Sequence, residues 1–527
     1  MKKIMERQDS NKPVADNNKR IAKNTLILYI RMFLVMIISL YTSRVVLDTL
    51  GISDFGIFNV VGGVVVMMNV INSAMSVSTQ RYLTFELGKR DLTQFKKTFS
   101  MCMSIFICLS ILIFILGETV GLWFVNTYLV IPEERIVAAN WVYQFALLSC
   151  IFSLLNNPYN AAIISHERMK IYAYIGMIEV ILKLCIVYVL LIVPTDRLIT
   201  YGGLTFISSF IITSIYRWYC IRNFKETLYT FYWDKVLFIR LLSYSGWNLF
   251  GSLSGVAKGQ GLNILINIFF GPSVNAARGI AYQVNGVVHS FFSNFYMAVR
   301  PQITKYYAQG NKEEMFKLIF SSSKMAFFLI LLVSMPLIIE APVIIKLWLG
   351  QIPDYVIVFI RLIIMITAID SMSTPLMTAI HATGDNRLYQ FTVGIIMIMT
   401  LPISYLFLKL GYSPISVFII SLFLSLLSLF VRLFIAKKQL GVPFWKYTSQ
   451  VVLRSFFVAL FAVVIPIWMY ISMPRNMVST VAVCMACAIS SMCFAFLIGL
   501  DKEEKVMIVA YIKNKVSKLI KRDDRIS

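Results

Sequence analysis

Long apolar runs separated by short polar turns set the pattern of this chain. They form about fourteen segments, each long enough to cross a bilayer as a helix of roughly 20 residues. Backbone groups in hydrocarbon must be hydrogen-bonded within their own segment, so each run is expected to be helical. The segments lie near residues 25–47, 55–80, 98–125, 136–162, 169–193, 198–219, 241–269, 273–299, 321–348, 355–381, 388–409, 413–436, 449–471 and 476–499. This pattern predicts an all-α polytopic membrane protein.

The composition excludes a soluble protein with a buried core. Of the 527 residues, 58% are hydrophobic and 14% are charged, and the mean hydropathy is +0.75. The first segment is as long as a true membrane helix and no small-residue cleavage site follows it, so we expect it to be retained rather than removed as a signal peptide. The eight cysteines lie in or beside apolar segments. Cys484 and Cys487 have no partners at metal-ligand spacing, which favours packing residues over a metal site.

A weak internal repeat indicates that two halves of the chain share one plan. The stretch from Leu47 to Gly88 holds a short turn and a long apolar helix, and the same order returns about 220 residues later, ending at Gly310. Polar residues spaced by threes and fours line one side of each helix: Asn69, Ser73, Ser76 and Gln80 in the first copy, and His289, Ser293, Tyr296 and Arg300 in the second. We therefore expect an N-terminal half at 25–220 and a C-terminal half at 241–438, with equal numbers of helices.

The positions of the basic residues predict the orientation of the chain. The net charge is +23, from 49 Lys and Arg against 26 Asp and Glu, which in a soluble chain would suggest a nucleic acid partner. Most of these basic residues instead lie at the termini and in the loops that follow even-numbered segments. The opposite loops hold only Arg135, Arg197, Lys346, Lys409 and Arg475. By the positive-inside rule both termini are cytoplasmic, and the basicity requires no nucleic acid.

Four further regions lie outside the two halves. They are a basic cytoplasmic N-terminus at 1–24, a cytoplasmic linker at 221–240, two additional transmembrane helices at 449–499 and a basic cytoplasmic tail at 500–527. The polybasic tail from Lys502 to Arg525 is expected to lie against anionic membrane lipids.

Basic and polar residues within the apolar segments are candidates for substrate binding, because a charge this deep is costly unless it faces water or protein. Arg31 and Arg44 could instead extend to the headgroups, and this alternative stays open. Lys258 lies near mid-segment, too deep to do so comfortably. A polar stripe on the eighth segment could be interhelical hydrogen bonding, but its length favours a water-filled face. The stripe comprises Asn275, Arg278, Tyr282, Asn285, His289, Ser293 and Tyr296, and Arg361 lies on the tenth segment.

Two acids in the segments are candidates for ion coupling by H⁺ or Na⁺. Glu179 and Lys183 are four residues apart on one helix face, which is typical of a structural ion pair as well as of a proton site. Asp370 lies near Pro375, where a kink is expected, and the alternative is an ion pair with Arg361 or Lys258. Six basic residues against two acids predict an electropositive cavity, and Arg can bind phosphate through a bidentate fork. No metal or cofactor is expected.

The first helical hairpin carries a family resemblance. Its distinctive residues are Lys23-Asn24-Thr25, Tyr41 through Leu47, LGISDFGIFNVVGG from Leu50 to Gly63, and TQRYL from Thr79 to Leu83. In these residues the chain resembles the multidrug/oligosaccharidyl-lipid/polysaccharide exporters, and within them the Wzx-type O-antigen and polysaccharide flippases of bacteria.

The resemblance implies a fold and a cargo. The fold is two pseudo-symmetric six-helix bundles around a central cavity, with two extra C-terminal helices, in the bacterial inner membrane. The cargo is an undecaprenyl pyrophosphate-linked oligosaccharide, moved from the cytoplasmic to the periplasmic leaflet, with other polysaccharide-assembly membrane proteins as possible partners.

Three rival functions remain open at this point. One is a Na⁺- or H⁺-coupled multidrug exporter of the same superfamily, which requires carboxylates in its cavity. Another is a flippase for peptidoglycan precursors, which charge alone does not distinguish. The last is a membrane glycosyltransferase or polymerase acting on lipid-linked sugars, which requires a catalytic loop or a carboxylate or His cluster. The outer loops are short and the three His residues are widely separated, so we expect a transporter and not an enzyme.

Overall fold

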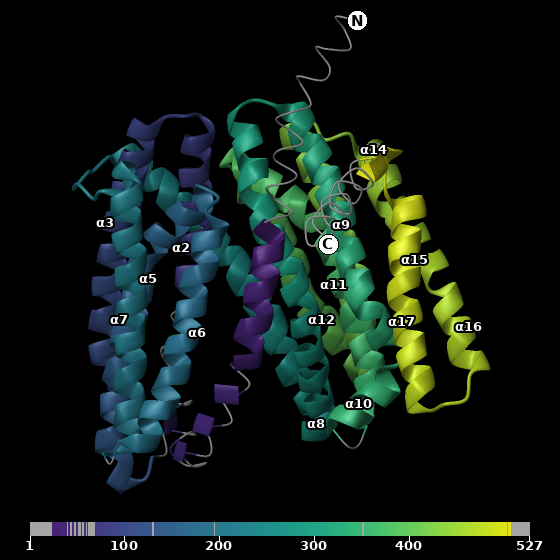
Figure 1. Cartoon of the computed structure of the whole chain (residues 1–527), viewed down its shortest axis with the longest axis horizontal. Coiled ribbons are helices and arrows are strands. Elements are labelled where there is room, and N and C mark those ends of the chain that lie inside the picture. Colours follow the sequence, from purple (N-terminus) through teal and green to yellow (C-terminus); the bar gives the residue numbers. More distant parts are fainter. Residues whose placement is uncertain are drawn as a thin grey trace, which may run out of the picture. The chain divides into compact units, whose positions relative to one another are not determined.

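The computed structural model describes residues 24–38, 41–42, 45–46, 49–50, 54, 57–58, 61, 69–128, 131–193, 195–349, 352–502 and 504–506. Within these ranges the regular structure is helical, and no strand occurs. The longer helices shown in Figure 1 are α2 (Asn69–Gly88), α3 (Leu92–Leu116), α4 (Leu122–Tyr128), α5 (Ile136–Ser165), α6 (Met169–Ile192), α7 (Arg197–Asn223), α8 (Lys235–Ala308), α9 (Lys312–Ile339), α10 (Ala341–Leu349), α11 (Val356–Thr383), α12 (Arg387–Lys409), α13 (Ile415–Leu440), α15 (Arg454–Ala462), α16 (Val464–Ser472) and α17 (Met477–Phe494).

The lengths of the helices match the expected membrane spans. Ten helices in the described part are long and apolar enough to cross a membrane, and Asn24–Ile38 is a shorter apolar helix. Helix α8 has 74 residues, but Gly271 interrupts it with φ +76° and ψ −176°. Glycine adopts this backbone conformation readily because it has no Cβ. The break separates the seventh and eighth predicted segments, and the prediction of an all-α polytopic membrane protein is confirmed.

The chain divides into two compact units that are discontinuous in sequence. Unit 1 comprises residues 1–259, 293–315 and 377–398, and unit 2 comprises residues 260–292, 316–376 and 399–527. Helices α8, α9, α11 and α12 therefore contribute segments to both units. The contiguous boundaries at 25–220, 221–240 and 241–438 stay a prediction.

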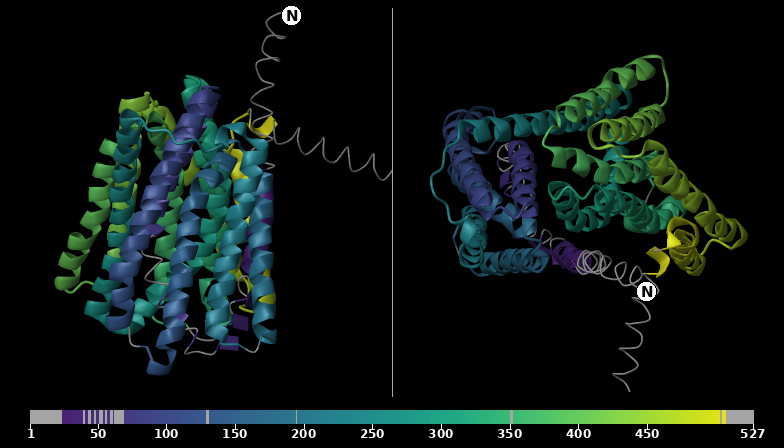
Figure 2. Two further views of the ribbon diagram at one scale, coloured as in Figure 1. Left: turned by 90° about the vertical axis from the view of Figure 1, so that its left-hand side faces the viewer. Right: turned by 90° about the horizontal axis from the view of Figure 1, so that it is seen from above.

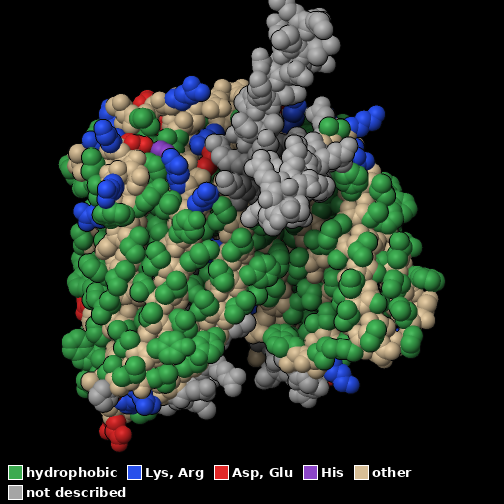
Figure 3. Space-filling view, in the orientation of Figure 1, with side chains coloured by type: hydrophobic (Ala, Val, Ile, Leu, Met, Phe, Trp, Pro, Cys, Tyr) green, Lys and Arg blue, Asp and Glu red, His purple; other side chains and the backbone are tan. Residues whose placement is uncertain are grey.

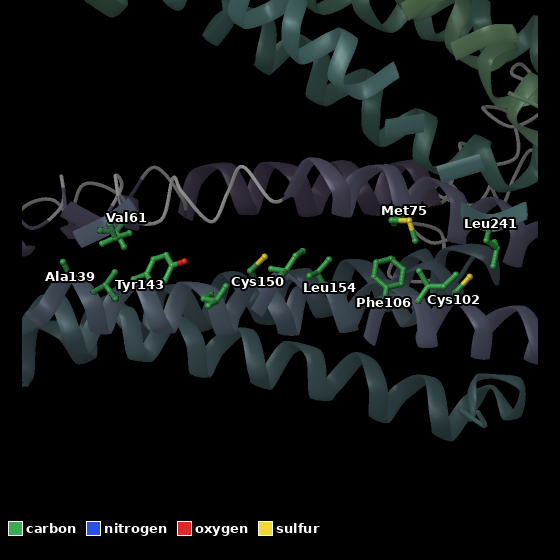
Figure 4. Packing of buried hydrophobic residues seen from close by; sticks show 14 of the residues in the cluster. Val61, Met75, Cys102, Phe106, Ala139, Tyr143, Cys150, Leu154 and Leu241 are labelled. Carbon is green, nitrogen blue, oxygen red and sulfur yellow. The ribbon is translucent and has the colours of Figure 1, made fainter. Parts of the chain in front are cut away.

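Helices α2, α3, α5 and α7 form the core of unit 1, where they run side by side (Figure 2). Their shared apolar cluster includes Val61, Tyr143 and Leu241 (Figure 4). The Tyr143 hydroxyl donates to the carbonyl of Gly117, at the start of a single π-helical turn that links α3 to α4. A Cβ at Gly121 would lie 2.0 Å from this hydroxyl. Glycine is thus required at this position for the helices to pack closely.

Two residues of the turn between α5 and α6, His166 and Glu167, make contacts with other segments of unit 1. The His166 ring stacks on Phe224 with centroids 4.0 Å apart, and its Nε2 lies 3.1 Å from a Glu226 oxygen. Glu167 has φ +58° and accepts hydrogen bonds from Gln302 and Lys305 in the last turns of α8. These interactions stabilise a left-handed backbone conformation that is unfavourable for a residue with a side chain.

In unit 2, a buried lysine joins α9 to the chain that follows α17. Lys324 is only 1% exposed, and its Nζ lies 2.7 Å from Asp501 Oδ2 and 2.8 Å from Glu504 Oε2. Arg454, at the start of α15, also binds Asp501. Burial by itself would raise the pKa of Asp501, but the hydrogen bonds from Lys324 and Arg454 hold it below its usual value. The two additional helices are thereby anchored to the rest of unit 2.

Candidate functional site

Unit 1 contains a polar cavity of about 460 Å³. It is lined by the helix Asn24–Ile38 and by helices α5, α6 and α7. The lining includes Arg31, Asn156, Asn160, Tyr172, Glu179 and Lys183. The α5 residues are four apart and the α6 residues are seven and four apart, so each set lies on one side of its helix. Three of the sequence-predicted site residues therefore share one cavity.

Arg31 gives this cavity its positive charge. Its guanidinium lies over the Tyr172 ring, 4.5 Å from the centroid, and a Cβ at Gly176 would lie 2.2 Å from Nε. The Nε atom is buried without a hydrogen-bond partner. Among the described residues, no carboxylate lies within ion-pair distance of Arg31. The ring face and the absence of a side chain at position 176 thus accommodate a cation that no acid neutralises.

The other charged groups of the cavity neutralise each other. Lys183 donates to Glu179 over 2.8 Å, as their four-residue spacing predicts. Asn156 and Asn160 each have a buried Oδ1 without a hydrogen-bond partner. A buried polar atom of this kind normally finds a partner, so the two oxygens offer acceptor sites for hydroxyl or amide donors. Among the described residues, the cavity therefore combines one cation that no carboxylate neutralises with two unused hydrogen-bond acceptors.

In unit 2, the polar stripe of α8 makes contacts within the bundle. Arg278 donates to Asn263 over 3.0 Å and lies over the Tyr282 ring at 4.6 Å. Asn285 accepts from Thr367 over 2.7 Å. His289, one turn further on, is exposed, and the side chain of Asn275 lies outside the described residues. Interhelical hydrogen bonding, the alternative left open by the sequence, accounts for Asn285.

Asp370 has an ion-pair partner that sequence reasoning missed. It accepts from Ser425 over 2.8 Å and from Arg432 over 3.3 Å, both on α13. Arg432 is buried and lies inside the apolar segment 413–436, but it was not among the candidate residues. The serines at 421, 425 and 428, spaced by threes and fours with Arg432, were the available signal. Arg361 instead donates to the Ile338 carbonyl over 3.0 Å.

Helix α11 runs through Pro375 from Val356 to Thr383. The role of Asp370 in ion coupling stays a prediction.

No known family model matches this chain, and no curated protein matches its sequence. Solved structures do match. One is an outward-facing multidrug resistance MATE family transporter of the MOP superfamily, with a TM-score of 0.69 and 14% identity over 81% of this chain and 96% of that chain. This chain has the MATE fold. A MATE protein in a bent conformation matches with a TM-score of 0.68 and 15% identity over 82% of this chain and 97% of that chain.

A third match comes from Pyrococcus furiosus Vc1. Its TM-score is 0.64, with 15% identity over 81% of this chain and 96% of that chain. It is described as a MOP superfamily transporter whose binding pocket has reverse polarity, which suggests a different function. The MATE-like fold expected from the resemblance is confirmed, and the Wzx-type assignment stays a prediction.

Two further predicted cations are Lys258 and Arg44. Lys258 is half-buried near the end of the α8 segment in unit 1. Arg44 lies outside the described residues. The predicted substrate-binding roles of Arg31, Arg44, Lys258, Arg278, Tyr282, Asn285, His289 and Arg361 stay predictions.

Arg81 of α2 is a buried cation of the MATE-fold chain that did not stand out as a site residue. Its Nε donates to the carbonyl of His381 over 3.1 Å, and its Nη2 donates to that of Ala382 over 2.6 Å. The guanidinium also lies over the Tyr82 ring at 4.3 Å. The two carbonyls belong to the last turn of α11, where carbonyls lack the usual intrahelical donor and the helix dipole favours a cation, and the carbonyl of His381 also accepts from Gly384 N–H and the Tyr244 hydroxyl. Arg81 therefore caps α11 from a helix about 300 residues away in sequence.

Proposed function

We propose that this protein is a membrane transporter that flips an anionic lipid-linked oligosaccharide from the cytoplasmic to the periplasmic leaflet of the bacterial inner membrane. The cargo is of the undecaprenyl pyrophosphate class. The proposal rests on Arg31, a guanidinium inside the cavity of unit 1 that none of the described carboxylates neutralises and whose buried Nε has no hydrogen-bond partner among the described residues. Such a group favours an anion, and guanidinium pairs with phosphate oxygens through charge-assisted hydrogen bonds.

The remaining cavity groups suit the sugar portion of such a cargo. The Oδ1 atoms of Asn156 and Asn160 would accept hydrogen bonds from sugar hydroxyls. The Glu179–Lys183 pair would supply both an acceptor and donors at the cavity wall. Translocation breaks no covalent bond, so no catalytic group is required. The cycle consists of population shifts between inward- and outward-facing states, biased by cargo and by any coupling ion.

The rival function is export of organic cations by a multidrug transporter. That function requires an acid that no basic residue neutralises, whereas Glu179 is paired with Lys183. The MOP superfamily transporter from Pyrococcus furiosus Vc1 is a precedent, since the reverse polarity of its binding pocket suggests a different function. The charge of the Arg31 cavity therefore favours an anionic cargo over a cationic drug.

The test is the accessibility of a pyrophosphate-linked oligosaccharide in proteoliposomes, measured for each leaflet with an impermeant sugar-modifying reagent. We expect Arg31→Ala to slow the appearance of sugar in the opposite leaflet about ten-fold or more, because it removes a charge-assisted contact. The matched control is Arg475→Ala, another arginine stacked on a tyrosine, 5.1 Å from the Tyr470 centroid, which should retain full activity.

Two outcomes would refute the flippase proposal. Equal flipping by the intact protein and Arg31→Ala would remove the observation on which it rests. Export of an organic cation by the intact protein, without movement of the sugar, would favour the multidrug exporter.

A further inference from the structure

A shallow groove lies on the outer surface of α7, close to the end of that helix. It is lined by Ser214, Arg217, Trp218, Ile221 and Arg222. Three of these positions, 214, 218 and 221, succeed one another at steps of four and three, so they share one face of α7. This groove is separate from the cavity around Arg31, with which it has no lining residue in common.

Both arginines of the groove are available to a ligand. Arg217 and Arg222 are exposed, and among the described residues neither has a carboxylate within ion-pair distance. The Arg222 guanidinium lies over the Trp218 ring, 5.4 Å from its centroid. A cation–π contact of this kind restrains a guanidinium but leaves N–H groups free to donate to a ligand. The geometry suits an oxyanion with several acceptor oxygens, such as a phosphodiester.

The same face of α7 becomes apolar toward the middle of the helix. Ile207 and Phe210, at the preceding steps of four and three, are 48% and 49% exposed. In a membrane-spanning helix such side chains contact lipid tails. Tryptophan is favoured at the boundary between tails and headgroups, and Trp218 is 60% exposed between the apolar stretch and the arginines. The face therefore follows the order of a phospholipid, with tails first and a charged headgroup at the end.

The surroundings of the groove also favour an anionic lipid. The charge distribution predicts that α7 ends at the cytoplasmic side, and the cytoplasmic leaflet is the one that carries a negative surface potential. Figure 3 shows the visible face of unit 1, with hydrophobic side chains along the helices and Lys and Arg gathered mostly toward the upper end. Arginines that extend to the headgroups without a specific ligand require neither a contact with a tryptophan ring nor a groove, and this site has both.

We propose that this groove is a binding site for an anionic phospholipid of the cytoplasmic leaflet. Arg217 and Arg222 bind the phosphate of the headgroup, Trp218 lies beneath it, and an acyl chain follows Phe210 and Ile207. The site is independent of the proposed flippase function, because it requires no lipid-linked sugar. It would persist if the protein exported another cargo.

Native mass spectrometry of the full-length protein, extracted from nanodiscs, tests the proposal. The nanodiscs contain either zwitterionic phosphatidylcholine alone or phosphatidylcholine mixed with phosphatidylglycerol. The double variant Arg217→Gln/Arg222→Gln is compared with the control Lys437→Gln/Lys438→Gln, two exposed basic residues at the end of α13. We expect retention of phosphatidylglycerol to weaken about five-fold for each arginine removed, since each basic group near an anionic surface contributes about a factor of five. The control should retain the lipid as the intact protein does.

A second variant separates charge from the stacked geometry. Trp218→Ala keeps both arginines and should still weaken retention, because Arg222 loses the ring that orients it. Equal retention of phosphatidylglycerol by the intact protein and the Arg217/Arg222 variant would overturn the proposal, as would equal retention of phosphatidylcholine. Displacement of the lipid by excess inorganic phosphate would assign the groove to a free anion instead.

Discussion

Replacing Arg81 by Ala tests whether a side chain of α2 stabilises the end of α11. The substitution removes two charge-assisted hydrogen bonds, to the carbonyls of His381 and Ala382, and a ring contact with Tyr82. Hydrogen bonds to charged groups contribute about 1.5–3 kcal/mol each, and a cation over an aromatic ring about 0.5–1 kcal/mol. Arg81 is only 7% exposed, so water replaces these contacts poorly. The three contacts share one guanidinium and are not additive, so we expect a loss in the lower part of their summed range, about 3.5–5 kcal/mol in the free energy of unfolding.

A neighbouring glycine provides an independent readout of the same contact. Gly384 has φ +84°, and a Cβ there would lie 2.8 Å from Nη2 of Arg81. Gly384→Ala therefore combines a backbone penalty of about 1–2 kcal/mol with displacement of the guanidinium. In the Arg81→Ala background only the backbone penalty remains. The double variant should thus lose less stability than the sum of the two single variants, by about 1 kcal/mol or more.

The assay is reversible unfolding of the purified protein in mixed micelles by graded denaturant, followed by tryptophan fluorescence. The control is Lys225→Ala, an exposed cation in the turn that follows α7, which should change stability by less than about 0.5 kcal/mol. A change of that small size for Arg81→Ala would refute the reasoning. Strict additivity with Gly384→Ala would also refute it, because the two residues would then not interact.

Three further substitutions follow from contacts in single units. Gly176→Ala places a Cβ 2.2 Å from Arg31 Nε, so it should reduce sugar flipping toward the level of Arg31→Ala in the same proteoliposome assay. Lys324→Ala removes the buried partner of Asp501 and Glu504, although Asp501 keeps Arg454, and should cost about 1.5–3 kcal/mol in denaturant unfolding, whereas a loss below about 0.5 kcal/mol would contradict the ion-pair argument. Burial, with a smaller contribution from nearby basic side chains, lowers the pKa of His166 to about 4, although the Glu226 carboxylate favours the imidazolium. The folded protein then binds fewer protons than the unfolded chain, so this contribution to stability is complete above about pH 6.5 and is lost as the pH falls toward 4; His166→Gln should flatten that part of a stability profile.

Local patterns in the sequence predicted helices and near neighbours well. Runs of apolar residues have the length that a bilayer requires, and the spacing of Glu179 and Lys183 places them on one helix face whatever the tertiary structure. The break at Gly271 also falls between two expected segments.

Contacts between distant helices left no comparable trace in the sequence. The Asp370–Arg432 pair joins α11 to α13, and Arg31 owes its position to a ring and a glycine on α6. Arg81 binds backbone carbonyls, and because every residue has one, the sequence does not show which carbonyls it binds. These arrangements depend on which helices pack against each other, and the hydropathy pattern does not determine those pairings.

The carboxylates bound to Lys324 set a limit on how far the protein can be shortened. Asp501 and Glu504 follow the last long helix, while the lysine that they neutralise lies on α9, almost 180 residues earlier in the sequence. A stop codon placed before codon 501 would remove both acids and leave a buried cation, whereas one after codon 506 would keep them. Affinity tags and fluorescent fusions at this end should therefore begin beyond residue 506.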